Sequence, residues 1–214
     1  MTPRFDLIIF DLDGTLIDSR QDVVTAVKRT LRDLHLPAVP EKLIDQNVGP
    51  GVKPLVQAIL GPKHQDLFDR ACELVLHHYS AHMLDHTRLY DGIDHVLRSL
   101  AKRKLAVVTN KPQAHADMIL EGLGIRHLFG AVLGPEACAR QKPDPDPIFK
   151  AMELLPALPA KTIMVGDTDI DITAGKRAGV KTCGVLYGFG TADSITAAQP
   201  DYLVTLPQEL EEVL

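Results

Sequence analysis

Two aspartates separated by one residue follow the first apolar run of the chain, in the sequence Asp11-Leu12-Asp13-Gly14-Thr15. Residues i and i+2 of an extended segment project to one side, so both carboxylates can face the same ligand. Gly14 permits backbone conformations that other residues resist. In open α/β sheets, ligands bind beyond the carboxyl ends of the strands, where this pair would lie. The pair is therefore a candidate ligand site, although a polar turn after a strand would also explain it.

Two further polar clusters follow apolar runs later in the chain, and a lysine lies in the segment between them. The three segments are Thr109-Asn110-Lys111, Gln141-Lys142-Pro143 and Gly166-Asp167-Thr168-Asp169-Ile170-Asp171. If the preceding strands are parallel, a hydroxyl, a lysine and a second group of acids would join the first pair at one edge of the sheet. Each cluster alone can be explained as surface polarity. All four in this order predict one shared site.

The elements that must position these groups alternate between strand and helix patterns. Five apolar, β-branched runs and a weaker sixth predict strands at Asp6–Phe10, Leu105–Thr109, Thr162–Val165, Thr182–Leu186, Tyr202–Thr205 and Ala131–Leu133. Such nearly continuous apolar runs suit a parallel sheet that is buried on both faces. Apolar stripes predict helices at Ile93–Arg103, Ala114–Leu123 with Met118 inward, and Ile148–Leu155 with Phe149 inward, and a loop at Gly188–Gln199. The alternation predicts an α/β protein with a doubly wound, Rossmann-like parallel sheet.

Residues 17–86 interrupt this alternation and contain no predicted strand. Helical patterns occur at Asp18–His35, with Ser19 available as its cap, at Leu55–Leu60 and at Gln65–Leu84. We therefore predict a core domain formed by residues 1–16 and 87–214, and a small inserted helical cap domain formed by residues 17–86.

The composition is that of an ordinary globular protein, with 45% apolar and 24% charged residues among 214. A net charge of −5 and the scarcity of aromatic residues disfavour a nucleic-acid-binding surface. The first apolar run, Leu7–Phe10, is too short for a signal peptide or a membrane span. Cys72, Cys138 and Cys183 are too scattered to predict disulfides. We expect a cytoplasmic protein that binds neither nucleic acid nor membrane.

The four clusters resemble the motifs of the haloacid dehalogenase superfamily of phosphohydrolases, and the resemblance extends over essentially the whole chain. The matching segments are D-L-D-G-T at 11–15, T-N at 109–110, K-P at 142–143 and G-D-T-D-I-D at 166–171. Within this superfamily, the chain is similar to the phosphoglycolate phosphatase subgroup. That similarity is carried by the small helical insertion and by L-Y-D-G-I at 89–93, A-G-K-R-A-G-V at 174–180 and G-V-L-Y-G-F-G at 184–190.

The resemblance implies an aspartyl-phosphate mechanism. Asp11 would be the nucleophile that attacks phosphorus, and Asp13 would protonate the leaving oxygen and later deprotonate water. Thr109 and Asn110 would hydrogen-bond the phosphoryl oxygens, and Lys142 would offset charge on the nucleophile and on the transferring group. The dehalogenases that share this core lack an acid at the position of Asp13, so the resemblance favours a phosphatase.

Charge crowding implies a magnesium ion at this site. Asp11, Asp167 and Asp171 would lie together with a phosphate dianion, and each like-charge pair at about 4 Å costs roughly 4 kcal/mol at an intermediate effective dielectric. Mg²⁺ is the usual hard cation beside phosphate. By resemblance, its ligands would be the carboxylates of Asp11 and Asp167 and the backbone carbonyl of Asp13, with Asp171 binding it directly or from behind these ligands.

Selection of the substrate is expected to come from the inserted helical domain, because the residues above handle only phosphate. The candidate loop is Val48–Lys53, whose glycines, Gly49 among them, allow close backbone approach. The N–H groups that open the following helix could bind a carboxylate, and Lys53 could pair with an anionic substrate. An ordinary helix–helix connection explains this loop equally well.

Several other polar residues receive a structural interpretation. Lys111 follows the T-N motif and could belong to the site, but a solvated side chain explains it equally well. Asp169 is interpreted as a solvated acid in a loop, and Asp144 as a turn residue. The histidines of the insertion are explained better by a polar face than by a zinc site; they are His77, His78, His82 and His86.

The function favoured by the sequence is magnesium-dependent hydrolysis of a small phosphate monoester, 2-phosphoglycolate to glycolate and phosphate, by a monomer or a homodimer. A sugar-phosphate phosphatase or hexose phosphomutase of the same superfamily is an alternative, and so is a non-catalytic phosphate-binding protein. Release of inorganic phosphate would separate a phosphatase from a mutase. The acid at Asp13 disfavours a mere binding protein, because phosphate binding alone does not need it.

Overall fold

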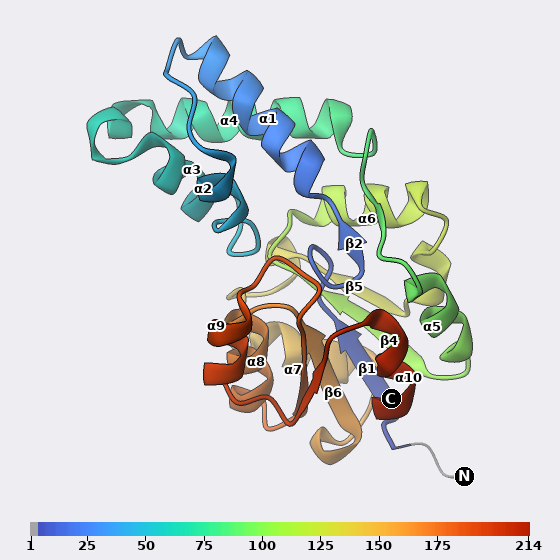
Figure 1. Ribbon diagram of the computed structural model, residues 1–214. Coiled ribbons are helices and arrows are strands. Elements are labelled where there is room, and N and C mark those ends of the chain that lie inside the picture. The colour runs from blue at the N-terminus through green and yellow to red at the C-terminus, as the bar shows by residue number, and fades with distance from the viewer. Residues whose placement is uncertain (1–3) are drawn as a thin grey trace. The chain divides into compact units, whose positions relative to one another are not determined.

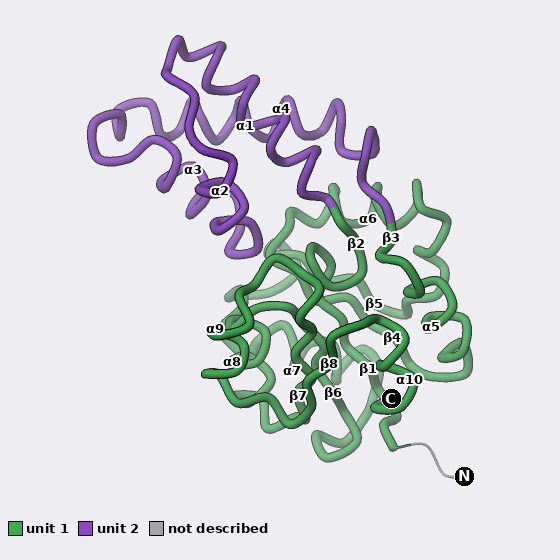
Figure 2. The backbone as a smooth tube through the Cα atoms, in the orientation of Figure 1, with its two compact units in different colours: residues 1–18, 89–214 green, residues 19–88 purple. Residues whose placement is uncertain are grey.

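The computed structural model describes residues 4–214, which form two compact units. The first unit contains the chain up to Asp18 and from Leu89 to the C-terminus, and the second contains Ser19–Arg88 (Figure 2). The chain therefore passes twice between the units, once at each end of the second unit.

A six-stranded parallel sheet forms the centre of the first unit, with the strand order β5-β4-β1-β6-β7-β8 (Figure 1). The strands are β1 (Leu7–Phe10), β4 (Lys104–Val108), β5 (Ala131–Leu133), β6 (Thr162–Gly166), β7 (Lys181–Val185) and β8 (Tyr202–Val204). Each of the six runs predicted as strands contributes one of them. The prediction of a doubly wound, parallel α/β sheet is confirmed.

Helices connect these strands and cover both faces of the sheet (Figure 1). They are α5 (Ile93–Ser99), α6 (Gln113–Gly122), α7 (Asp146–Leu154), α8 (Asp169–Arg177), α9 (Ala192–Ala197) and α10 (Leu210–Val213). The predicted loop at 188–199 is wrong in part, because α9 lies inside it. The Thr191 hydroxyl caps α9 by accepting a hydrogen bond from the Ser194 N–H at 3.2 Å, a local signal that the apolar pattern does not contain.

The central strand β1 is buried on both faces. Leu7 and Ile9 pack into an apolar cluster with residues of α7 and α8. Successive side chains of a strand point to opposite faces, so Ile8 and Phe10 face the other layer, and both are fully buried as well. Burial on two faces is the reason why the sequence of this strand is continuously apolar and does not alternate.

The predicted apolar stripe is wrong in two of the helices. The prediction places Met118 and Phe149 inward, but these residues are 49% and 46% exposed. The buried faces instead consist of Ala116, Ile119 and Leu120 in α6 and of Pro147, Ile148 and Ala151 in α7. Alanine and proline contribute little to an apolar pattern, so the pattern favoured the larger neighbouring side chains.

The carboxyl end of β1 is the topological switch point of the sheet. After β1, the chain forms β4 and β5 on one side and then β6, β7 and β8 on the other. Phe10 at the end of β1 is in register with Val107 in β4 and with Val165 in β6. The residues that follow these three strands therefore meet at one edge, which is where open α/β sheets bind ligands.

The second unit is mainly helical. It contains α1 (Arg20–Asp33), α2 (Glu41–Asp45), α3 (Val52–Leu60) and α4 (Phe68–His82), with a 3₁₀ segment at Pro62–Leu67. Ser19 occupies the position before α1, but its side chain makes no capping hydrogen bond to that helix. The role of this unit as a cap domain stays a prediction.

Two very short strands, β2 (Ile17–Asp18) and β3 (Arg88–Leu89), form a separate two-stranded sheet. The prediction that no strand lies in residues 17–86 is therefore wrong for Ile17 and Asp18. A strand of two residues is too short to produce the alternation or the apolar run by which strands are predicted.

Asp22 ties α1 to the segment that ends the second unit. Its carboxylate accepts hydrogen bonds from the Thr87 N–H and hydroxyl, both at 2.8 Å, and from the His86 N–H at 3.1 Å. The His86 ring nitrogen Nδ1 lies 3.0 Å away as well. Burial raises the pKa of Asp22, but the hydrogen bonds from Thr87 and His86 outweigh it, so that the pKa lies below its ordinary value.

Replacing Asp22 with Asn should destabilise the fold at neutral pH by about 1.5–3 kcal/mol, since hydrogen bonds to a charged group are stronger than those to a neutral amide. Because the folded-state pKa is lowered, this stabilisation is present above the pKa of the unfolded chain and is lost as the pH falls through the folded-state pKa. Urea unfolding of both proteins at neutral pH and at acidic pH measures the difference. Asp69→Asn, at an exposed acid of α4, is the control, and a pH-independent difference at Asp22 would contradict this account.

Candidate active site

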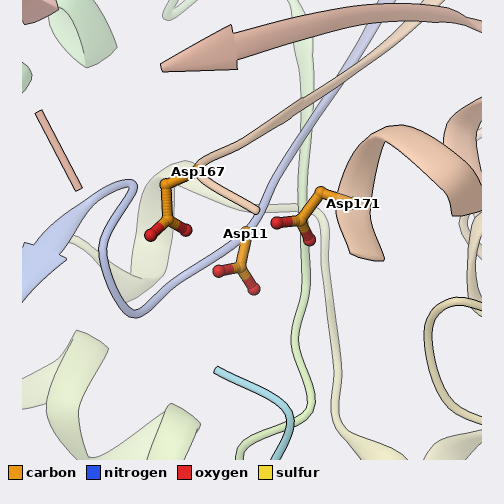
Figure 3. A group of neighbouring side chains, drawn as sticks. All are labelled: Asp11, Asp167 and Asp171. Atoms are coloured by element: carbon orange, nitrogen blue, oxygen red, sulfur yellow. The ribbon is translucent and has the colours of Figure 1, made fainter. Parts of the chain in front are cut away.

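Three carboxylates converge at the switch point of the sheet (Figure 3). Asp11 directly follows β1, Asp167 directly follows β6, and Asp171 lies in the first turn of α8. Each offers an oxygen, and these oxygens all lie within 4.8 Å of one another. The exposed fractions of the three residues are 6%, 0% and 1%. The acids that the sequence assigned to two different motifs therefore form one buried cluster.

Lys142 supplies positive charge to this cluster. Its Nζ donates hydrogen bonds to an oxygen of Asp11 at 2.7 Å and to an oxygen of Asp171 at 2.6 Å, and the residue is 3% exposed. Burial opposes the charge of Lys142, but Asp11 and Asp171 outweigh that effect and raise its pKa. The lysine is therefore an ammonium ion that bridges two carboxylates.

The single positive charge of Lys142 does not neutralise the negative charge of three carboxylates. Burial raises the pKa of Asp11 well above its ordinary value, Asp171 and Asp167 raise it further, and Lys142 opposes them. Burial and Asp171 raise the pKa of Asp167 to about 7. A divalent cation relieves an excess of negative charge of this kind, and carboxylate oxygens are the ligands that Mg²⁺ prefers. The donor set and its charge fit the magnesium ion that the sequence predicts.

Asp167 is held in place by three donors. The Thr15 hydroxyl donates to one carboxylate oxygen at 3.2 Å, and the N–H groups of Phe189 and Gly190 donate to the other at 2.7 and 3.3 Å. A Cβ on Gly190 would lie 1.9 Å from the Asp167 carbonyl oxygen, so only glycine allows this loop to reach the carboxylate. In the sequence, the segment 184–190 supports only the family resemblance, and Thr15 has no predicted role of its own. In the structure, both hold Asp167 in place.

Gly14 is required by the same carboxylate. Its φ of +86° is in the region that favours glycine, and a Cβ at this position would lie 2.1 Å from an oxygen of Asp167. The unusual backbone conformation that the sequence predicts for Gly14 is therefore present, and it lets the turn after β1 pack directly against Asp167.

Asp171 has two functions in the local structure. One of its oxygens accepts from Lys142, and the other accepts from the Thr168 N–H at 3.1 Å and hydroxyl at 2.7 Å. The contact with the Thr168 N–H belongs to the capping box that begins α8, and the Thr168 hydroxyl adds a second donor to the same oxygen. The start of the helix therefore fixes the orientation of a carboxylate in the cluster.

Asp13 lies beside a second lysine. The Nζ of Lys111 is 2.8 and 2.9 Å from the two carboxylate oxygens of Asp13, and Lys111 is only 9% exposed. The alternative of a solvated Lys111 is therefore wrong. Burial lowers the pKa of the neighbouring His115, and the charge of Lys111 lowers it further.

Thr109 and Asn110 follow β4 and are both buried. The Thr109 hydroxyl accepts a hydrogen bond from the Lys111 N–H at 3.1 Å. The Asn110 side-chain amide donates to the Lys142 carbonyl at 3.0 Å, so it secures the loop that carries this lysine. Contact of these two residues with a phosphoryl group stays a prediction.

The remaining predicted residues lie outside this cluster. Gly49 and Lys53 belong to the second unit, Gly49 with a φ of +111° and Lys53 exposed in the first turn of α3. Their assignment to substrate binding stays a prediction. Asp144 accepts from the Asp146 N–H at 3.1 Å, as a turn residue does, and Asp169 is exposed but begins α8 and is not in a loop.

Three histidines of the second unit, His78, His82 and His86, each contact a different aspartate. His78 contacts Asp33 at 2.7 Å, and His82 contacts Asp85 at 2.8 Å. Within residues 4–214, the one group of three potential metal ligands close enough to share an ion is that of Asp11, Asp167 and Asp171. The interpretation of the histidines as a polar face agrees with these contacts.

Comparison with known proteins identifies the class. The sequence profile described as haloacid dehalogenase-like hydrolase matches residues 8–185, so the chain belongs to this family. It is 35% identical to a phosphoglycolate phosphatase of Aquifex aeolicus, over 97% of this chain and 96% of the relative. It is 34% identical to an N-acetylmuramic acid 6-phosphate phosphatase of Pseudomonas aeruginosa, over 99% of this chain and 95% of the relative.

Comparison with a solved structure also shows similarity to a phosphatase. The crystal structure of a predicted phosphoglycolate phosphatase from Haemophilus somnus superposes with a TM-score of 0.93 at 30% identity, over 100% of this chain and 99% of that one. The expected family, fold class and enzyme class, a hydrolase similar to phosphoglycolate phosphatases, are thus confirmed. Across residues 4–214, none of the helices combines the length and the apolar character that crossing a membrane requires.

Thr15→Val should weaken binding of a divalent cation about 10–100-fold, because a residue that orients a metal ligand typically has an effect of this size. The substitution keeps the volume of the side chain but removes the donor to Asp167. Titration calorimetry with Mg²⁺ measures the affinity without any turnover. Thr15→Ser retains the hydroxyl and should bind like the wild type. Equal affinity of the Val variant and the wild type would show that Thr15 does not position Asp167.

Proposed function

We propose that this protein is a magnesium-dependent phosphatase that hydrolyses 2-phosphoglycolate to glycolate and phosphate through an aspartyl-phosphate at Asp11. The observation that carries the proposal is the buried cluster of Asp11, Asp167 and Asp171 around Lys142, with a further acid, Asp13, two residues from the nucleophile. The names of the relatives support a phosphate ester as the substrate. The protein would act on this small metabolite in the cytoplasm, as a monomer or a homodimer.

The reaction takes two steps at this edge of the sheet. In the first, a carboxylate oxygen of Asp11 forms a bond to phosphorus, the ester P–O bond breaks, and Asp13 gives its proton to the leaving oxygen. In the second, Asp13 takes a proton from water, the water oxygen bonds to phosphorus, and the acyl-phosphate P–O bond breaks to restore Asp11. Asp13 thus acts first as a general acid and then as a general base, and the proton that it takes from water restores its starting form.

Positive charge stabilises both steps. Lys142 keeps its ammonium against Asp11, where negative charge from the transferring phosphoryl group would build up. A Mg²⁺ ion held by Asp11, Asp167, Asp171 and the Asp13 carbonyl would supply further charge to the phosphoryl oxygens. Thr109 and Asn110, directly after β4, would donate hydrogen bonds to the same oxygens.

Asp11→Asn should reduce phosphate release by several orders of magnitude, because a neutral amide cannot form the acyl phosphate. Phosphate release is measured with excess Mg²⁺, and circular dichroism verifies the fold. Asp144→Asn, which alters a turn residue outside the cluster, is the matched control and should retain activity. A folded Asp11→Asn variant with turnover near that of the wild type would disprove the covalent mechanism.

A sugar phosphate is the second candidate substrate. The observation in its favour is the similarity to the N-acetylmuramic acid 6-phosphate phosphatase, which is nearly as high as that to the phosphoglycolate phosphatase. Against it, the loop at 48–53 offers glycines and Lys53, which suit a short anion better than a ring of hydroxyl groups. A hexose phosphomutase or a non-catalytic binding protein would release no phosphate.

The wild type should therefore hydrolyse 2-phosphoglycolate with a higher kcat/KM than glucose 1-phosphate, glucose 6-phosphate or N-acetylmuramic acid 6-phosphate. A single charge-assisted contact to the carboxylate would provide roughly ten- to a hundredfold of selectivity. Side-by-side kinetics with the four esters and Mg²⁺ test the ranking. A tenfold higher kcat/KM for any of the sugar phosphates would refute the substrate and leave the chemistry of Asp11 in place.

A further inference from the structure

The first unit buries two lysines beside its acids, and the two contact different carboxylates. Lys142 bridges Asp11 and Asp171. Lys111 instead lies against Asp13, with its Nζ within 2.9 Å of both carboxylate oxygens. Lysine is rarely this buried unless a partner charge holds it. One ammonium therefore serves the nucleophile, and the other serves the acid that exchanges a proton with the leaving group.

We propose that Lys111 is a specificity residue that selects esters whose leaving group carries a carboxylate close to the ester oxygen. The inference rests on the proposed function, in which the ester oxygen takes its proton from Asp13. An oxygen in contact with Asp13 is also close to the ammonium that contacts both oxygens of that acid. In 2-phosphoglycolate, the carboxyl carbon is two bonds from the ester oxygen, so the carboxylate lies within reach of Lys111.

The site already contains an ammonium that serves two carboxylates. Lys142 contacts Asp11 at 2.7 Å and Asp171 at 2.6 Å. Lys111 would bridge Asp13 and the carboxylate of the substrate in the same way. Charge-assisted hydrogen bonds are stronger than neutral ones, and a buried ammonium is less screened by water than an exposed one. A carboxylate would therefore gain more from this contact than a hydroxyl group would.

The backbone of Lys111 is fixed before any substrate binds. Its N–H donates to the Thr109 hydroxyl at 3.1 Å. A Cβ on Gly134 would lie 2.9 Å from the Lys111 carbonyl oxygen, so the loop after β5 packs directly on this backbone. A contact that is organised in advance loses little conformational entropy on binding, which favours selectivity.

Two pairs of esters that differ at one group test this proposal. They are 2-phosphoglycolate with 2-hydroxyethyl phosphate, and 3-phosphoglycerate with glycerol 3-phosphate. Lys111→Met should lower kcat/KM for the carboxylated member about tenfold or more beyond its effect on the neutral member, as expected for loss of a charge-assisted contact. Lys150→Met, at a lysine of α7 paired with Glu153 on the surface, is the control and should keep the wild-type ratio. If Lys111→Met lowers both members equally, the lysine only holds Asp13 and the proposal is wrong.

Binding without turnover extends the test to variants that lose activity. In an Asp11→Asn background, calorimetry gives the Kd of each ester with and without Lys111→Met. The added substitution should raise the Kd of the carboxylated member about tenfold more than that of its neutral partner. An equal change, or no preference for the carboxylated member before the substitution, would overturn the proposal. Failure of the proposed function is a separate result, because the wild type would then release no phosphate from any ester while the binding preference could still be measured.

Discussion

The repulsion among three buried aspartates at the switch point of the sheet is the constraint on which the rest of this site depends. Asp11, Asp167 and Asp171 in their ionised forms carry three negative charges, and Lys142 carries one positive charge. The excess of two negative charges equals the charge of one divalent cation. The raised pKa values of Asp11 and Asp167 show the same imbalance, because burial penalises charges that have no compensation.

The fold holds these charges together through elements that are stable for other reasons. A parallel sheet buried on both faces fixes the ends of β1, β4 and β6 at one edge, and the capping box of α8 orients Asp171. Glycines let the backbone approach Asp167 closely enough to donate hydrogen bonds or to leave room for its oxygens. The apolar core and the helix cap therefore stabilise an arrangement that its own electrostatics oppose, as is common for sites that do chemistry.

The sequence predicts the sheet and the acidic cluster because both depend on local patterns. Continuous apolar runs mark the strands, and polar residues directly after them mark the site. Features that depend on packing over long sequence distances are not visible in this way. The burial of Lys111 against Asp13, 98 positions away, and the bond from Asn110 to the Lys142 carbonyl leave no local signal. The exposed Met118 and Phe149 show the converse error, in which a large apolar residue is assigned to a core that small residues fill.

The position of Lys111 changes where selectivity is expected to arise. From the sequence, the core residues handle only phosphate, so the choice of leaving group falls to the second unit. A buried ammonium beside Asp13 gives the first unit its own preference, because a carboxylate near the ester oxygen would meet a positive charge that a hydroxyl group cannot use to the same extent. In that case, selection of a carboxylated leaving group does not depend on the contact predicted for Lys53 of the second unit. The core would then bind the phosphoryl group and also discriminate between leaving groups, through two buried lysines that contact different aspartates.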